Sequence, residues 1–411
     1  MTQLPVSVVI VSRGRPEELQ RCLLGVSQLQ YPMFEVVVVA DPDGVRAAQN
    51  MPFADGLKVL SFDEPNISAA RNLGLVHAAG EVVAFIDDDA VPEPQWLRYL
   101  VAPCAQSDVA AMSGFVRGRN GISYQWKARS LDALGEAHDL DVNMQQASIL
   151  KPPKGRAIKT EGTNMAFRRS VLIELGGFDP AFHYFLDETD LNMRLASAGH
   201  TTAIVPMAEV HHGFAANPMR TKARVPLDIF DIGASWAVFQ HKHIAESLHK
   251  DQWDRLRRQE RHRLLQHMVG GGLEPRDVPR LMRRLDQGYL DGQQRGFEKG
   301  TLPKHPAAPF EAFPADRRKS SFVPTRPMRF KKDYAMAVER TKNGEIVTLL
   351  NLSRTAIYHK LKFDRGGIWI QSGGIYGKAD RKDGLVCITT RARRIAKERA
   401  RVASQRGLSE D

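Results

Sequence analysis

The chain has 411 residues, of which 43% are hydrophobic and 26% are charged, values that are ordinary for a globular protein with two or three domains. No stretch approaches the roughly 18 consecutive apolar residues of a membrane-spanning helix, and residues 1–11 lack the pattern of a secretory signal. We therefore expect a cytoplasmic protein. The three cysteines lie far apart in the sequence, which excludes a disulfide framework and a paired metal-ligand motif.

The net charge of +11 is distributed unevenly along the chain. Residues 1–218 carry 18 Lys and Arg against 25 Asp and Glu, so residues 219–411 carry the remaining 40 against 22. A basic second half suits an anionic membrane surface, an acidic acceptor or a nucleic acid, and it is also compatible with an ordinary solvated surface. We expect nucleic acid to be the less favoured partner, and a basic surface could hold the protein at the inner face of a membrane. The sequence leaves the oligomeric state open.

The first 90 residues alternate between apolar β-branched runs and helical patterns. The sequence predicts strands at 6–11, 36–40, 57–62 and 82–86, with helices at 16–29 and 68–79. The runs at 6–11 and 36–40 are apolar without alternation, as expected of parallel strands that are covered on both faces. This order predicts an α/β fold with a doubly wound, mostly parallel sheet, whose ligands bind beyond the carboxyl ends of the strands.

The rest of the chain is patterned less clearly. We expect loops with a helix over 120–159, helices over 166–175 and from about 187 to 199, and amphipathic helices over 226–300. Six prolines between residues 303 and 327 indicate a linker. The predicted division is a first domain over 1–218, a helical extension packed on it over 219–302, a Pro-rich linker over 303–328, and a small basic C-terminal module with its tail over 329–411.

Acidic residues follow two of the predicted strands. Asp87, Asp88 and Asp89 come directly after the strand at 82–86, so their carboxylates should emerge at the carboxyl edge of the sheet. Adjacent anions repel one another, and a divalent cation bound partly by substrate phosphates would stabilise them. A solvated acidic turn is the alternative. Asp41 ends the second strand, where it could accept hydrogen bonds from a base or ribose, or form a turn.

Three further groups have residue types suited to binding or proton transfer. Arg71 lies one turn into a helix and could pair with the aspartates or hold a phosphate. Asp187 and Asp190 share a helix face with Arg194 and could form an ion pair, whereas the neighbouring Glu188 points elsewhere and is a candidate general base. At the end of an apolar segment, residues 211 and 212 are both histidines, and a neutral imidazole there could complete a metal site.

Over about residues 5–215 the chain resembles the family 2 inverting glycosyltransferases of the GT-A fold. The resemblance rests on six segments that occur in the family's order and spacing. They are Val-Ser-Val-Val-Ile-Val-Ser-Arg-Gly-Arg-Pro at 6–16, Asn-Ile-Ser-Ala-Ala-Arg-Asn-Leu-Gly at 66–74, Gly-Glu at 80–81 leading into Phe-Ile-Asp-Asp-Asp at 85–89, Gly-Thr-Asn-Met-Ala-Phe-Arg-Arg at 162–169, Gly-Gly-Phe-Asp at 176–179, and Asp-Glu-Thr-Asp-Leu at 187–191 with Arg194.

The resemblance implies transfer of a sugar, with inversion, from a nucleotide-diphosphate-sugar donor to a hydroxyl of a polysaccharide, glycan or lipid-linked acceptor. It implies that Asp87 and Asp89 form an aspartate-any-aspartate element that holds ribose and a Mg²⁺ or Mn²⁺ ion. His212, or less favourably His211, would face the metal. The donor-binding residues that it implies are Ser12, Arg13, Arg15, Asp41, Asn66, Arg71, Asp87, Asp88 and Asn164.

The same resemblance places Glu188 at the position of the catalytic base. The family usually has a Glu-Asp pair there, and its aspartate is the base. Here the pair reads Asp187-Glu188, which is the reverse order, so Asp187 and Asp190 remain rivals for the role.

Two other interpretations have a basis in the sequence. A nucleotidyltransferase would share the sheet, but such enzymes usually carry a Gly-rich phosphate loop after the first strand, and residues 12–16 contain one glycine and a helix-starting proline. Residues 345–361 look like a helix-turn-helix, which would make the C-terminal module a nucleic-acid binder. The glycines that follow indicate strands and turns instead, so residues 346–350 could equally form a strand.

Overall fold

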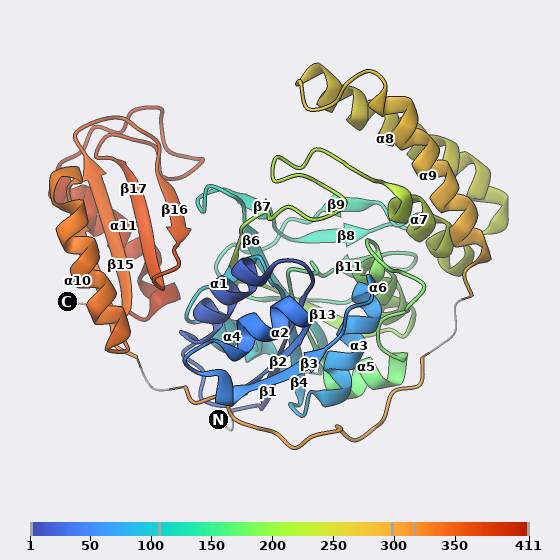
Figure 1. The fold of residues 1–411 in the computed structure, drawn as a ribbon, viewed down its shortest axis with the longest axis horizontal. Helices are drawn as coiled ribbons and strands as arrows, with labels where there is room; N and C mark the ends of the chain where they lie inside the picture. Colours follow the sequence, from blue (N-terminus) through green and yellow to red (C-terminus); the bar gives the residue numbers. More distant parts are fainter. Residues whose placement is uncertain (1–2, 106–107, 297–299, 316–317, 409–411) are drawn as a thin grey trace.

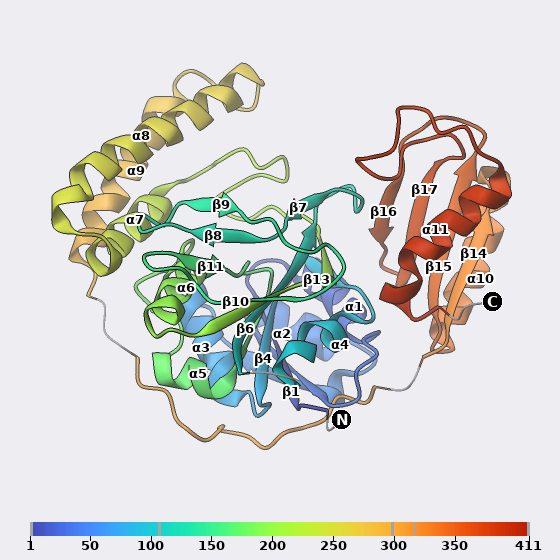
Figure 2. The same ribbon diagram turned by 180° about the vertical axis from the view of Figure 1, so that it is seen from behind.

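The computed structural model describes residues 3–105, 108–296, 300–315 and 318–408. Figure 1 shows an α/β domain built from the N-terminal half, a pair of long helices that projects from it, and a small α/β module formed by the C-terminal residues. An extended segment passes beneath the first domain and leads into the module, which stands on the opposite side of the domain from the long helices (Figures 1 and 2).

A mixed sheet forms the centre of the first domain, in the order β10-β13-β6-β12-β4-β1-β2-β3, with β5 paired to β13 and β7 paired to β6. The strands are β1 Val6–Ser12, β2 Phe34–Ala40, β3 Leu57–Ser61, β4 Val82–Asp87, β5 Ala90–Pro92, β6 Val109–Arg117, β7 Tyr124–Trp126, β10 Ser148–Leu150, β12 Asn164–Arg168 and β13 Thr201–His212. The pairs β1–β2, β1–β4, β2–β3 and β6–β13 are parallel, and β12 runs antiparallel between β4 and β6. The prediction of an α/β fold with a mostly parallel sheet is confirmed.

Helices cover both faces of this sheet. On one face lie α1 Pro16–Val26, α2 Pro42–Gln49 and α4 Trp96–Leu100, and on the other α3 Ile67–His77, α5 Arg169–Leu175 and α6 Asp187–Ser197. Along β1, Val8 and Ile10 pack in the first core and Val9 in the second, because successive side chains of a strand point to opposite faces. Both faces are therefore buried, which explains why the strands read as unbroken apolar runs.

Two of the predicted elements after residue 110 are wrong. Between 120 and 159 the structure has no helix but the short strands β7 and β10, together with β8 Arg129–Leu131, β9 Ala137–Asp139 and β11 Ala157–Lys159, which form a second sheet in the order β11-β8-β9. The helix predicted over 166–175 begins only at Arg169, because residues 164–168 form β12. These residues have high helix propensity, but their backbone groups pair with two neighbouring strands, and this tertiary pairing overrides the local preference.

Three helices follow the sheet, in agreement with the pattern over 226–300. They are α7 Phe230–His243, α8 Glu246–Val269 and α9 Asp277–Gln294. Gly288 and Gly292 of α9 allow close contact with α7, because a Cβ atom at these positions would lie 1.9 Å and 2.2 Å from the carbonyl oxygens of Phe230 and Ala234. Among the helices that the structure describes, none has both the length and the hydrophobicity needed to cross a bilayer.

The proline-rich segment lies along the first domain in an extended conformation. Its backbone amides donate to backbone carbonyls of the domain, from Ala307 N to Val76 O at 2.9 Å and from Phe313 N to Phe34 O at 2.7 Å. The ring of Phe313 is buried and stacks on that of Phe34 with centroids 5.2 Å apart. The segment is therefore tied to the domain as it passes from the long helices to the C-terminal module.

The C-terminal module is a four-stranded sheet in the order β14-β15-β17-β16, packed against two helices. Its elements are β14 Ser320–Thr325, α10 Phe330–Lys342, β15 Ile346–Ser353, β16 Lys360–Phe363, β17 Ile368–Gly374 and α11 Arg391–Arg406. The described residues also form short 3₁₀ helices, which are η1 Ala54–Gly56, η2 Ala102–Ala105 and η3 Pro327–Arg329. Residues 346–353 form the central strand β15, so the helix-turn-helix interpretation is wrong and the strand alternative is confirmed. The reason is that Ile346–Leu350 is buried between β14 and β17.

A buried ion pair joins the module to the first domain. Arg406, near the end of α11, is fully buried, and its Nε and Nη2 donate to the two carboxylate oxygens of Glu93 at 2.9 Å each. The indole of Trp369 lies under the guanidinium, 4.3 Å from Cζ to the ring centroid. Opposite charges held out of water in this bidentate geometry are costly to separate, since either one alone would be left without compensation.

We expect Arg406→Met to destabilise the protein by about 3 to 5 kcal/mol, because it leaves the Glu93 carboxylate buried without its arginine partner and, among the described residues, in contact only with His211. Arg365→Met is a matched control, because Arg365 also bridges module and domain through Glu17, but both side chains are largely exposed (79% and 66%). That control should cost less than about 1 kcal/mol. Urea unfolding followed by tryptophan fluorescence measures both, and equal effects would contradict the role of the buried pair.

Candidate active site

The carboxyl ends of neighbouring parallel strands meet at one edge of the central sheet. In the register of β1 and β4, Val11 lies opposite Asp87. Ser12 ends β1, and Asp88 and Asp89 follow β4 directly. The polar residues that the sequence placed after these strands therefore gather at the edge where ligands of open α/β sheets bind.

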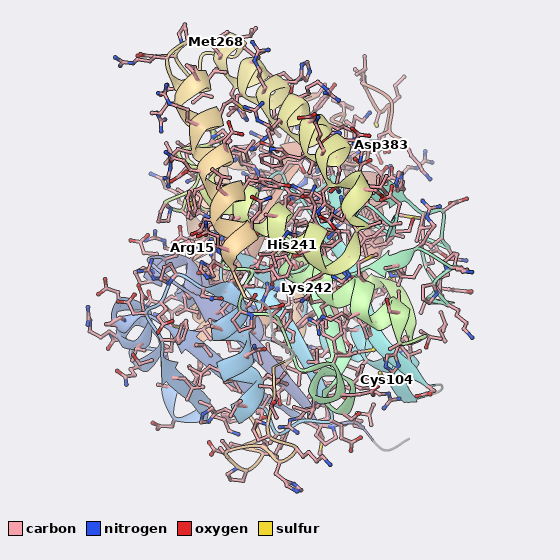
Figure 3. All side chains as sticks on the ribbon, turned by 90° about the vertical axis from the view of Figure 1, so that its right-hand side faces the viewer. Arg15, Cys104, His241, Lys242, Met268 and Asp383 are labelled. Carbon is pink, nitrogen blue, oxygen red and sulfur yellow. The ribbon has the colours of Figure 1, made fainter. Side chains whose placement is uncertain are left out.

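Two arginines compensate the charges of the first two aspartates. Asp88 is fully buried, and its carboxylate accepts a hydrogen bond from Ser12 Oγ at 2.7 Å and pairs with Arg15 Nη2 at 2.6 Å. Burial raises the pKa of Asp88, and the guanidinium of Arg15, a residue labelled about half way up in Figure 3, opposes that shift. Asp87 lies 3.5 Å from Arg71 Nη2 and is only partly buried. The charge of Asp88 is thus compensated inside the protein by Arg15, whereas Asp87 faces a cavity.

Asp87, Asp89 and His212 form a three-residue group whose potential ligand atoms all lie within 4.8 Å of one another. His212 Nε2 is 3.3 Å from Asp89 Oδ1, and its Nδ1 is 2.8 Å from Gln125 Oε1. Because a carboxamide oxygen only accepts hydrogen bonds, this contact places a proton on Nδ1 and directs Nε2 toward the carboxylates. Nε2 therefore lies where it could share a cation with them.

The neighbouring histidine faces the other way. His211 Nε2 lies 2.8 Å from Glu93 Oε1, and its ring packs 5.0 Å from that of Trp369 in the C-terminal module. The two histidines point to opposite faces because they are consecutive residues of β13. The structure therefore brings His212 to the aspartates and leaves His211 in the contact with the module.

Helix α6 presents acidic residues from its first turn. Phe185 and Leu186 precede it with φ values of 73° and 65°, a conformation that side chains other than glycine rarely adopt. This tight turn aims the helix N-terminus, with Asp187 and Glu188, at the cavity. The partial positive charge of a helix N-terminus favours carboxylates at these positions.

Glu188 is held by a lysine from the second sheet. Lys159 Nζ donates to Glu188 Oε1 at 2.8 Å and also contacts Thr189 Oγ1 at 3.1 Å. Burial by itself would raise the pKa of the Glu188 carboxyl, but the Lys159 ammonium reverses this and lowers the pKa to about 2. The side chain is 18% exposed, so an ionised carboxylate reaches the cavity.

The two rivals of Glu188 have buried cationic partners. Asp187 contacts the Arg71 guanidinium, which is itself 3% exposed. Asp190 is fully buried and accepts from Arg194 at 2.7 Å and from Lys242 and His243 at 2.8 Å each. Asp190 does not line the cavity, and its contacts fasten α6 to α7.

A cavity of about 730 Å³ joins the metal-binding group to the α6 carboxylates. Asp87, His212, Arg71, Asp187 and Glu188 all line it. Residues that the sequence argument missed line it as well: Trp126, Arg129, Lys159, Arg220, Arg224 and Arg263. The basic composition after residue 218 was the only signal for the last three, and no pattern in the sequence pointed to the others.

Four predicted donor-binding residues have structural contacts of their own. Asp41 caps α2 through Gly44 N at 2.9 Å, and Asn66 caps α3 through Ala69 N at 3.0 Å. Arg13 pairs with an exposed aspartate at 3.1 Å. Asn164 is fully buried and bonds to backbone and indole groups of the core. Within the described residues, none of the four lines the cavity.

Comparison with known proteins gives relatives for the first half of the chain. Glycosyltransferase AglE of Haloferax volcanii is 31% identical over 180 residues, which cover 42% of this chain and 55% of that protein. Glucosyl-dolichyl phosphate glucuronosyltransferase of the same organism is 30% identical over 183 residues, covering 43% and 56%. The chain thus spans about half the length of the curated relatives that it matches.

Among solved structures, this chain is similar to the mannosyltransferase PcManGT from Pyrobaculum calidifontis, which was solved in complex with GDP-Man and Mn²⁺. The sequence identity is 17% and the TM-score is 0.42, and the match covers 72% of this chain and 88% of that one. The model of the family described as glycosyltransferase like family 2 matches residues 4–225, which is more than half of the chain and includes every residue that the sequence assigned to the site. The resemblance noted in the sequence is therefore confirmed, and the chain belongs to glycosyltransferase family 2, with a GT-A fold.

Proposed function

We propose that the protein transfers a sugar from a nucleotide-diphosphate-sugar to an acceptor hydroxyl, with inversion and with the help of a divalent cation. Membership of the family supports glycosyl transfer. The observation that carries the rest is that the Asp87, Asp89 and His212 group and the ionised Glu188 line or border the same cavity. One end of the cavity suits a metal-bound diphosphate, and the other suits a hydroxyl that must lose a proton.

The residues of the metal-binding group suit the proposed ion. Two carboxylates and an imidazole offer hard oxygen donors and one nitrogen donor, a set that accommodates Mn²⁺ and, less readily, Mg²⁺. Asp87, Asp89 and His212 would hold the ion, with Gln125 orienting the imidazole. When bound, the ion would supply Lewis-acid neutralisation of the departing diphosphate.

The side chains around this group supply further positive charge. Arg224 Nη1 is buried and has no hydrogen-bond partner among the described residues, and burial, together with the nearby charge of Arg220, lowers the pKa of Arg224. Its neighbour Arg220 has an unpartnered Nε, and both side chains line the cavity. A buried N–H group without a partner is costly, and a phosphate oxygen is a suitable acceptor for it. We assign these two arginines to the donor diphosphate.

Glu188 acts as the base in this proposal. Its carboxylate takes the proton as the acceptor O–H bond breaks, the oxygen forms a bond to the anomeric carbon, and the bond from that carbon to the diphosphate breaks on the opposite side. The nucleoside diphosphate leaves, and the configuration is inverted. Lys159 keeps Glu188 ionised and fixes its position, which favours a defined line of attack.

The acceptor is assigned only by class. One relative is named for a dolichyl phosphate-linked sugar, which supports a lipid-linked acceptor, and a free glycan or polysaccharide chain has the same reacting group. All of these present a sugar hydroxyl to the base, so the proposed chemistry is the same for each.

We expect Glu188→Gln to lower kcat by about 10² to 10⁴-fold while donor affinity changes little, because the amide keeps the shape of the carboxylate but cannot take a proton. Glu136→Gln is the matched control, since Glu136 lines the same cavity and pairs with Arg255 at 3.0 Å. Transfer assays with a panel of nucleotide sugars, together with calorimetry of donor binding, measure both. Near-normal turnover of Glu188→Gln would exclude it as the base.

The two consecutive histidines give a second test. His212→Ala should raise the Mn²⁺ concentration required for half-maximal donor binding by about tenfold or more, because one of three protein ligands is lost. His211→Ala should leave that concentration unchanged and lower thermal stability, since His211 contacts Glu93 and not the aspartates. Calorimetric titration with Mn²⁺ and donor separates the outcomes, and an equal loss of metal affinity in both variants would contradict the assignment.

The pH dependence of transfer should change in Lys159→Met. Glu188 works as a base only when ionised, so activity is lost as pH falls through its pKa, which Lys159 holds at about 2. Without the ammonium the raising effect of burial is no longer offset by Lys159, so this pKa rises and an acidic limb should move into the measurable range. The profile of kcat at saturating Mn²⁺ tests this, and superimposable profiles for the two proteins would refute it.

A further inference from the structure

Exposed apolar side chains gather at one end of the C-terminal module. The strand β15 pairs in parallel with β14 and β17, so all three strands end at the same edge of the sheet. The segments that follow them are 326–329, 354–359 and 375–390, and we call these three segments the loop patch. Its exposed large apolar residues are Met328, Ile357, Tyr358, Tyr376, Leu385, Val386 and Ile388. Leu385 is 72% and Ile388 99% exposed, and such grouping is unusual unless a surface contacts something apolar.

The loop patch is one continuous surface. Tyr376 N donates to Thr355 O at 3.1 Å, which fastens the third segment to the second, and Cys387 N donates to Tyr376 O at 2.9 Å within the third segment. Arg391, just after the third segment, donates from Nη2 to O of Thr325, just before the first segment, at 2.8 Å. The apolar side chains are therefore held on neighbouring, mutually bonded backbone.

Cations surround these apolar side chains. The exposed basic residues in and beside the loop patch are Arg326, Arg329, Arg354, Lys360, Arg381 and Lys382. The carboxylates within it are those of Asp380 and Asp383, and Asp383 pairs with Lys397 Nζ at 2.8 Å. The surface thus combines projecting aliphatic and tyrosine side chains with an excess of positive charge.

A second projection of similar character lies at the same end of the molecule. At the end of α8, where the chain turns toward α9, Val269 is 84% exposed, and exposed arginines lie before and after it in the chain, including Arg261 and Arg276. Figure 3 shows Met268, beside Val269 at the end of α8, and Asp383 of the loop patch both toward the upper end of the molecule, with Arg15 of the sheet edge below them. Figure 1 shows the two projections on either side of the domain.

We propose that the loop patch docks the protein on an anionic lipid bilayer, with the aliphatic side chains entering the headgroup boundary and the cations contacting the lipid phosphates. Charge complementarity and the shape of the surface carry this choice. Projecting Leu, Val and Ile side chains suit a deformable apolar boundary, the tyrosines suit the bilayer interface, and lysine and arginine attract acidic headgroups. A nucleic acid would use the cations but would leave the aliphatic side chains in water.

Docking of the loop patch on a bilayer does not depend on the proposed function. Its consequence for catalysis does rest on that function. With the loop patch and the α8–α9 turn on a bilayer, the carboxyl edge of the sheet would face a membrane. A lipid-linked sugar could then present its hydroxyl to the cavity while its chain stays in the bilayer.

The test is sedimentation of the full-length protein with vesicles of phosphatidylcholine, with and without phosphatidylserine, at low and high salt. We expect binding to the anionic vesicles that weakens with salt. The double variant Leu385→Ser with Ile388→Ser should lower the partition coefficient by about tenfold or more, because the apolar area that enters the bilayer is lost. Leu290→Ser is the matched control, since Leu290 is 60% exposed but lies on α9 and outside the loop patch. It should bind like the unaltered protein.

Circular dichroism of the same preparations shows that the variants are folded, and donor hydrolysis measured without vesicles separates this proposal from the proposed function. Vesicle binding without any transferase activity would contradict the proposed function but would leave the docking surface supported. Equal binding of the double variant and the Leu290→Ser control, or no binding to anionic vesicles, overturns the docking surface. Salt-sensitive retention on duplex DNA that the double variant loses, in a protein that ignores vesicles, would overturn it in favour of a nucleic-acid partner.

Discussion

Mutual repulsion among three consecutive aspartates is the constraint around which the candidate site is organised. Adjacent carboxylates at the end of a buried strand are stable only if each finds its own positive partner. Here Asp88 has Arg15, Asp87 has Arg71, and Asp89 lies beside both Arg15 and the His212 imidazole. These partners come from three different parts of the first domain, so the domain has to be assembled before the acidic edge is neutralised.

Arg71 connects the two acidic groups of the cavity. Its buried guanidinium contacts Asp187 at the start of α6 and also lies near Asp87 at the end of β4. A single cation therefore stabilises carboxylates on both sides of the cavity and sets their separation. Glu188 is left outside this pair and has its own partner, Lys159, so it is ionised without being bound to the metal-binding group.

The C-terminal module is also physically linked to the strand that carries the metal-facing histidine. Arg406 and Trp369 surround the Glu93 carboxylate and the His211 ring, and His211 directly precedes His212 in β13. The buried charge pair holds the module at the edge of the sheet. The same attachment leaves the opposite end of the module, with its exposed apolar loops, free to contact another surface.

The sequence by itself determined the parallel strands of the central sheet, because the local composition of runs such as 36–40 indicates burial on both faces. It placed Asp87–Asp89 at the carboxyl edge of that sheet. It also identified the family through short ordered motifs. Only the tertiary structure decided that 164–168 is a strand, that His212 and not His211 meets the aspartates, and that Lys159 holds Glu188. The physical reason is that these outcomes depend on contacts between residues far apart in the chain. The ion pair of Glu93 and Arg406 is another contact of this kind. Local periodicity carries no record of which distant group will supply a strand partner or a counter-charge.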